Sequence, residues 1–203
     1  MPAFQRSFSW RKPQILSLLE SVYNGYPIGS LLFWETYEEV LEAASNEILP
    51  SPDIPQRPTK PVSYPTTYVI DGVQRLSCLH NCLRWREIDT PDRFNVVFDI
   101  ETKRFAHYGR GVTDYSYVHL SSVFYPQATD QRLFDVDGAS QHPSFLEAVT
   151  RLRARFIDYE IPVTTLTEYD LDEVISIFQR LNTTGIRLTR EEIRRAEAER
   201  KQH

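Results

Sequence analysis

Five consecutive residues, Asp71-Gly72-Val73-Gln74-Arg75, combine side chains that can bind phosphate groups and metal ions. Arg75 offers a forked, charged hydrogen-bond donor that matches the oxygens of a phosphate. The carboxylate of Asp71 can hold a divalent cation, directly or through water, or orient an attacking water. The motif is therefore a candidate corner for phosphate chemistry.

The residues on either side of this motif predict a strand followed by a helix. Thr66 to Ile70 are β-branched and aromatic, as strands prefer, whereas Leu76, Leu79 and Leu83 recur at helical spacing. Gly72 then lies at the turn, where a positive φ is available and the first free N–H groups of the helix favour an anion. A purely structural alternative stays open, in which Asp71 caps the helix and Arg75 pairs with it one turn later.

Two other polar clusters have the composition of the same kind of site. The first contains Gln5 and Arg6, and the second runs from Phe178 to Gly185 and includes Arg180 and Asn182. The second cluster equally predicts the end of a helix, with Asn182 or Gly185 in the left-handed region. The two interpretations are compatible, because a capped turn also presents free amides to a ligand.

Composition and charge limit the classes of function. The chain has 203 residues, of which 41% are hydrophobic, enough for one substantial core. A net charge of -5 argues against a protein that coats nucleic acid with its whole surface. A local basic run at Arg151, Arg153 and Arg155 keeps DNA binding as an alternative. The sequence shows neither a membrane-spanning stretch nor a secretory signal, so we expect a cytoplasmic protein without membrane contact.

The two cysteines, Cys78 and Cys82, lie four residues apart on the predicted helix after the motif. Two thiols without a clear histidine partner make a poor zinc site, since His80 projects elsewhere around the helix. We therefore expect both thiols to be buried and to act as small hydrophobic side chains.

The remaining pattern predicts one α+β domain over residues 1–203. The expected elements, in chain order, are a helix through 15–22 that Asn24-Gly25 ends, a strand at 30–34, an acidic helical stretch to about 48, a proline-rich loop at about 50–65, a hairpin over 94–107, and a largely helical C-terminal part from about 144. That last part contains an edge strand at 159–164 and helices at 171–181 and from Thr189 onward.

Four blocks carry a resemblance to a known family. They are Gln5-Arg6 with Trp10, the segment from Gly25 to Leu32 that leads into Trp34-Glu35, the motif from Ile70 to Leu76, and the block from Phe178 to Leu188. In these blocks, and over nearly its whole length, the chain resembles the N-terminal domain family of GmrSD-type modification-dependent restriction systems. The resemblance implies a fold similar to that of ParB and sulfiredoxin, a mixed small sheet with surrounding helices.

The resemblance also implies a function in defence against phage. Members of the family are expected to bind and hydrolyse a nucleoside triphosphate with Mg²⁺ or another divalent cation, and to act with an HNH-type nuclease domain or subunit that reaches DNA. On this reading Asp71 is the catalytic and metal-binding residue. The implied nucleotide- and phosphate-binding residues are Gln5, Arg6, Gly72, Gln74, Arg75, Arg180 and Asn182. An oligomer is compatible with this arrangement.

The sequence departs from the family pattern in two places. Val73 stands where the Asp-Gly-Gln-Gln-Arg hallmark has its first glutamine, which removes a donor and leaves nucleotide binding better supported than hydrolysis. After Asn182 no His-Asn-His metal site follows, so we expect nuclease activity to belong to a partner. The alternative function is a non-catalytic DNA-binding or protein-interaction module of the same fold. A self-sufficient ParB-like nuclease is the least favoured interpretation.

Overall fold

The structure is a computed structural model that describes residues 8–37, 65–84, 92–109, 117–124 and 143–183. The chain falls into two compact units, residues 1–167 and residues 168–203, and each is described by itself. The described residues contain five helices and two three-stranded sheets, which confirms the predicted α+β class. A single domain over 1–203 and the likeness to ParB stay predictions.

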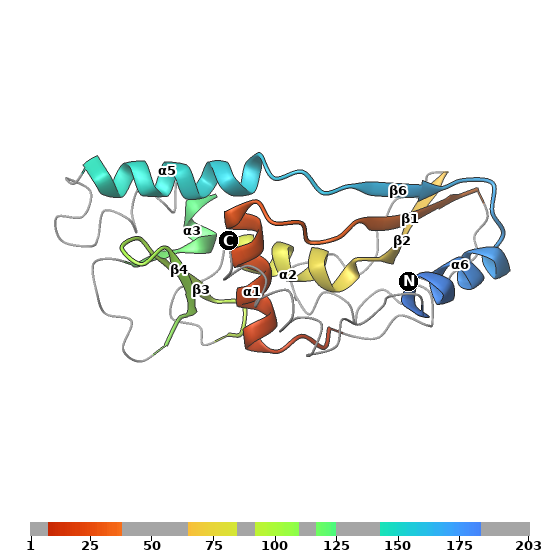
Figure 1. The fold of residues 1–203 in the computed structure, drawn as a ribbon, viewed down its shortest axis with the longest axis horizontal. Helices are drawn as coiled ribbons and strands as arrows, with labels where there is room; N and C mark the ends of the chain where they lie inside the picture. Colours follow the sequence, from red (N-terminus) through yellow and green to blue (C-terminus); the bar gives the residue numbers. More distant parts are fainter. Residues whose placement is uncertain (1–7, 38–64, 85–91, 110–116, 125–142, 184–203) are drawn as a thin grey trace, which may run out of the picture. The chain divides into compact units, whose positions relative to one another are not determined.

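The first sheet is built around strand β1 (Leu31–Thr36), which runs between β2 (Thr66–Asp71) and β6 (Val163–Leu166) (Figure 1). β1 pairs with β2 in the antiparallel sense and with β6 in the parallel sense. The edge strand predicted at 159–164 is real but begins later, at Val163. The physical reason is Pro162, which cannot donate a ladder bond, although its carbonyl accepts one from Leu31 N at 2.8 Å.

The second sheet contains the predicted hairpin. Strands β3 (Val96–Asp99) and β4 (Arg104–His107) pair in the antiparallel sense, and β5 (Tyr117–His119) pairs with the other edge of β3. Asp99 shapes the hairpin turn by accepting hydrogen bonds from Glu101 N, Thr102 N and Thr102 Oγ1. Burial by itself raises the pKa of Asp99, but these three bonds outweigh it and lower the pKa. β5 and the short helix α3 (Leu120–Val123) were not predicted.

Three helices complete the first unit: α1 (Lys12–Asn24), α2 (Val73–Leu83) and α5 (Pro143–Ile157). α1 packs against β4, α5 and α2, with Ile15, Leu18 and Leu19 in the core. It ends as predicted at Gly25, which has φ +72°; the N–H groups of Gly25 and Tyr26 then bond back to the last turn. Among the described residues, no helix has the length and apolar character needed to cross a bilayer.

Helix α2 carries both cysteines into the core, as predicted. Cys78 and Cys82 are fully buried, neither forms a disulfide within the described residues, and both contact the apolar side chains of the first unit. Their role is packing, and among the described residues no group of three or more His, Cys, Asp or Glu side chains could hold a metal ion.

In the second unit the structure describes residues 168–183, of which Leu171–Thr183 form helix α6. Its first turn is closed by a reciprocal pair, because Asp170 N donates to Glu173 Oε2 at 3.0 Å and Glu173 N donates to Asp170 Oδ1 at 2.8 Å. The helix runs two residues further than predicted, so Asn182 lies in its last turn and not in a left-handed position.

Several predicted segments lie partly or wholly outside the described residues. Glu35 and Thr36 extend β1 and do not begin the acidic helix predicted there. The rest of that stretch, nearly all of the proline-rich loop, Gly185 and the helix from Thr189 fall outside the description.

His107 provides a pH-dependent contact between the second sheet and α1. Its Nε2 lies 3.0 Å from the carbonyl oxygen of Lys12, and its buried Nδ1 has no hydrogen-bond partner among the residues that the structure describes. Burial lowers the pKa of His107 below its ordinary value of 6.5; the Lys12 charge acts in the same direction, while the bond to the Lys12 carbonyl opposes it. The folded protein therefore favours the neutral imidazole.

We expect the free energy of unfolding to fall as the pH drops below about 6.5, because the unfolded chain then binds a proton more readily than the folded one. The measurement is urea denaturation of the parent and of His107→Gln between about pH 7.5 and pH 5. The variant should lose less stability over this interval. Part of the loss should remain in the variant, since burial, and next the charge of Arg84, lower the pKa of His80 too. An identical loss in both proteins would contradict the assignment to His107.

Candidate functional site

The guanidinium of Arg75 joins two segments that are distant in sequence. Its Nη2 donates to Asp71 Oδ2 at 3.0 Å, and its Nη1 donates to the carbonyl oxygen of Ile28 at 2.9 Å. The Arg75 side chain is 14% exposed, whereas that of Asp71 is 50% exposed. Asp71 thus pairs with Arg75 across one turn, as the structural alternative predicted. It is Gly72, however, and not Asp71, that occupies the cap position of α2.

Two glycines make room for this guanidinium. Gly29 has φ +87° and Gly72 has φ +99°, so both adopt a conformation that side chains disfavour. A Cβ atom on Gly29 would lie 2.8 Å from Arg75 Nη1, and one on Gly72 would lie 3.3 Å from Arg75 Nη2 and collide with the Leu31 side chain. The glycines therefore form a slot into which the guanidinium fits.

An irregularity in the sheet places the motif at this slot. Leu32 pairs with Asp71 and Phe33 pairs with Val69, so the register shifts by one residue between them. Such bulges bend a strand and redirect the side chains next to it. The extra residue, Ile70, is 1% exposed, so it anchors the end of β2 in the core while Asp71 faces solvent.

The N-terminal segment reaches the first turn of α2. Ser9 N donates to the Oε1 atom of Gln74 at 2.9 Å. Gln5 and Arg6 lie outside the described residues, but they precede Ser9 closely in the sequence. The structure therefore brings the chain just after the first predicted cluster to the second one.

A groove lies beside the motif, and we call it the Trp10 groove. It has a volume of about 430 Å³ and is lined by Trp10, Pro13, Gln14, Ser17, Leu18, Ser21, Ile28 and Arg75. An indole ring, hydroxyl groups and one guanidinium are the kinds of group that hold a ring system and an anionic tail. The groove has the size of a small-molecule site.

The motif from Asp71 to Arg75, which we call the Asp71 corner, offers a metal ion one carboxylate, that of Asp71. Asp71 is half exposed, and its Oδ2 is engaged by Arg75. Mg²⁺ commonly keeps several waters and uses one or two carboxylates together with the phosphates of a substrate. A single carboxylate therefore suits a Mg²⁺ ion that is bound together with a nucleotide. It does not suit an ion held by protein ligands alone.

The third predicted cluster belongs to the second unit. Arg180 is exposed near the end of α6, and the side chain of Asn182 lies outside the description. Because each unit is described by itself, their approach to Asp71 stays a prediction. Sequence reasoning missed the role of Ile28 and Gly29, although it singled out the segment from Gly25 to Leu32. The signal was a pair of glycines flanking Tyr-Pro-Ile, which predicts a turn but not its partner.

The fold and the corner together define an α+β domain in which a strand, a glycine and a helix hold an arginine against a glycine-containing loop. The chain matches the family described as GmrSD restriction endonuclease, N-terminal domain, over residues 1–199. It belongs to this family, as the four sequence blocks predicted, and is a component of a DNA restriction system that defends against phage. A comparison with curated proteins found no match.

The slot predicts an unequal effect of two glycine substitutions. Gly72→Ala should lower the free energy of unfolding by about 2 kcal/mol or more, because the new methyl group meets Leu31 and Arg75 and the backbone keeps a positive φ. Gly25→Ala is the matched control, since φ is +72° there and nothing lies within 4 Å of the added Cβ. It should cost about 1 kcal/mol from backbone strain alone. Urea denaturation measures both; equal losses would contradict the slot.

Proposed function

We propose that this domain binds a nucleoside triphosphate with Mg²⁺ at the Asp71 corner and the Trp10 groove, and that the bound nucleotide regulates a nuclease. The observation that supports this most strongly is the position of Arg75. Its guanidinium is held by Asp71 and Ile28 where it lines the Trp10 groove, and Arg75 lies in the first turn of α2. A fixed cation beside a helix N-terminus is well suited to phosphate.

The corner would hold the phosphate end of the nucleotide. A guanidinium has five N–H donors, and among the described residues the two bonds to Asp71 and Ile28 account for two of them. The first N–H groups of α2, after Gly72, have no intrahelical acceptor. Arg75 and these amides can therefore contact phosphate without breaking the existing bonds.

The Trp10 groove would hold the base and sugar. Trp10 provides a ring for stacking, and Ile28 provides an apolar wall. Ser17 and Ser21 provide hydroxyl groups, although the Ser21 hydroxyl already donates to the Ser17 carbonyl at 2.8 Å. These contacts are general for a ring and a sugar, so the proposal does not extend to one particular base.

Mg²⁺ would neutralise charge on the phosphates, with Asp71 as its protein ligand. Asp71 could alternatively orient a water for hydrolysis. Binding is the part that the corner supports best, since Val73 replaces a polar residue of the family motif and offers no donor. Turnover is the secondary part of the proposal.

The nuclease would be a partner domain or subunit of the same restriction system. Family membership supports this pairing, and DNA would be reached through the partner. The nucleotide could affect the partner through the loop of residues 25–30, because Arg75 contacts both the proposed phosphate site and the Ile28 carbonyl.

Nucleotide binding should raise the melting temperature and change the fluorescence of Trp10. At a hundredfold excess over Kd, a triphosphate with Mg²⁺ should stabilise the folded chain by about 2.7 kcal/mol, a shift of roughly 5 °C or more. The measurement is a thermal-shift series with the four common ribonucleoside triphosphates, with and without Mg²⁺, followed by fluorescence titration. No shift with any of the four would overturn the proposal.

Two variants locate the site. Trp10→Phe should keep the melting shift but lose most of the fluorescence change, and Asp71→Asn should lose the part of the shift that requires Mg²⁺. Asp71 is preferable to Arg75 as a target because it is half exposed, whereas Arg75 also holds Ile28. A fluorescence change that persists unaltered in Trp10→Phe would place the nucleotide elsewhere.

A further inference from the structure

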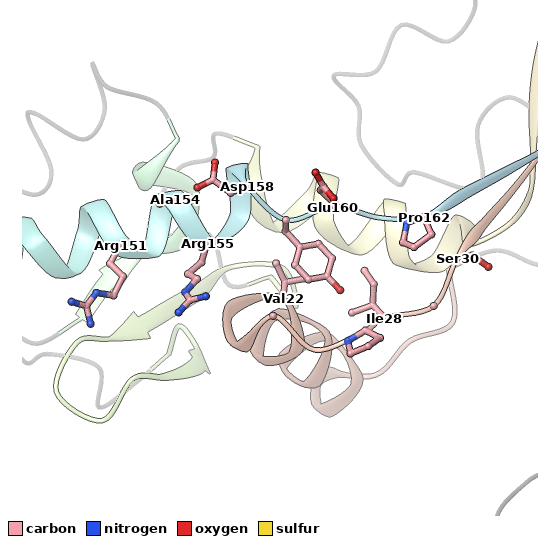
Figure 2. Close-up of a pocket in the computed structure, with 13 residues that line it drawn as sticks. Val22, Ile28, Ser30, Arg151, Ala154, Arg155, Asp158, Glu160 and Pro162 are labelled. Carbon is pink, nitrogen blue, oxygen red and sulfur yellow. The ribbon is translucent and has the colours of Figure 1, made fainter.

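A second and larger cavity is lined by the loop of residues 25–30 and by the end of α5 with the segment that follows it. We call it the Arg155 cavity; Figure 2 shows it, and its volume is about 690 Å³. It is lined by Val22, Gly25, Pro27, Ile28, Gly29, Ser30, Arg151, Ala154, Arg155, Asp158, Tyr159, Glu160 and Pro162. All of these residues belong to the first unit.

The charged side chains around this cavity are sorted by sign. Figure 2 shows the guanidinium groups of Arg151 and Arg155 on one side of α5, while the carboxylates of Asp158 and Glu160 point to the other side. The two arginines are four residues apart and therefore share a helical face. The cavity has a cationic wall, although its lining residues carry no net charge.

The arginines are available to a ligand. Arg151 pairs with Glu147 at 2.9 Å, but the two side chains are 55% and 71% exposed, so water screens the pair and an anion can replace it at little cost. Arg155 is exposed and forms no ion pair with another described residue. A phosphate group could accept hydrogen bonds from both guanidinium groups.

The rest of the cavity suits a ring. Val22, Ile28, Pro27 and Pro162 give it an apolar floor. The Tyr159 hydroxyl donates to the carbonyl oxygen of Tyr26 at 2.6 Å, which fixes an aromatic ring within the lining. Tyr159 and the two arginines line the same cavity. An aromatic ring can stack on a base while nearby arginines bind its phosphate.

We propose that the Arg155 cavity is a separate binding site for a nucleoside phosphate, with the phosphate on Arg151 and Arg155 and the base against Tyr159. The ligand chemistry has two sources, a free nucleotide or one unit of a nucleic-acid strand. The cavity lies within the size range of small-molecule sites, and most of its rim is exposed, so both sources can reach it.

This site is independent of the proposed triphosphate site. Asp71 and Trp10 do not line the Arg155 cavity, and Arg151 and Arg155 do not line the Trp10 groove. Ile28 is the residue that lines both, and Arg75 holds its carbonyl. One site can therefore fail its test while the other passes.

The full chain is titrated with each of the four nucleoside 5′-monophosphates, and binding is measured by calorimetry. It is also titrated against a fluorescein-labelled single-stranded oligonucleotide of about ten nucleotides, and binding is measured by fluorescence anisotropy. At least one ligand should bind. Arg155→Ala should weaken its binding about tenfold or more, the usual effect of losing a charged hydrogen bond, and the double variant with Arg151→Ala should weaken it further. Binding of a monophosphate identifies a free nucleotide, and binding of the oligonucleotide alone identifies a strand.

The matched control is Arg153→Ala, an exposed arginine on the same helix that does not line the cavity. It should change Kd by about twofold or less. Asp71→Asn and Trp10→Phe should leave Kd unchanged, which separates this site from the triphosphate site. The proposal is overturned if neither class of ligand binds, or if Arg153→Ala weakens binding as much as Arg155→Ala, since that would indicate diffuse surface charge.

Discussion

The two hydrogen bonds of Arg75 are the constraint on which the site depends. One reaches Asp71 at the end of β2 and the other reaches the carbonyl of Ile28, far earlier in the chain. A guanidinium that is mostly buried needs such partners, because removing it from water is costly when its donors are unmet. Glycine at positions 29 and 72 leaves space for this group, since a Cβ atom at either position would crowd it, and the positive φ of both residues favours glycine independently.

The loop of residues 25–30 is consequently held at two carbonyls. Arg75, on α2, donates to the carbonyl of Ile28, and Tyr159, in the segment after α5, donates to that of Tyr26. The loop lines the Arg155 cavity with most of its residues, and its Ile28 also lines the Trp10 groove. Because two hydrogen bonds already fix the loop, a ligand that binds beside it would order few further residues, which lowers the entropic cost of binding.

Hydrophobic periodicity and turn residues predicted most of the helices and strands but few of the contacts between them. Helix α1, the β3–β4 hairpin and the strand–glycine–helix order of the motif follow from periodicity and turn residues, which act over a few positions. The bond from Arg75 to Ile28 could not be predicted in this way, because it depends on how β1 and β2 pair and on the bulge between Leu32 and Phe33. The sequence predicted that β6 begins at residue 159, because a tyrosine and an isoleucine before Pro162 are typical of a strand. Its pairing with β1 begins at Val163.

The pairing of β1 also sets the order in which the chain can fold. Its antiparallel partner β2 follows within the first half of the sequence, but its parallel partner β6 comes only after α5. During synthesis, one edge of a strand that contains the buried residues Leu31 and Trp34 stays unpaired until residues 163–166 have left the ribosome. Contacts of such long sequence separation form slowly and leave apolar edges open to association. Co-translational capture of this edge, by a chaperone or a partner chain, would therefore compete directly with completion of the sheet.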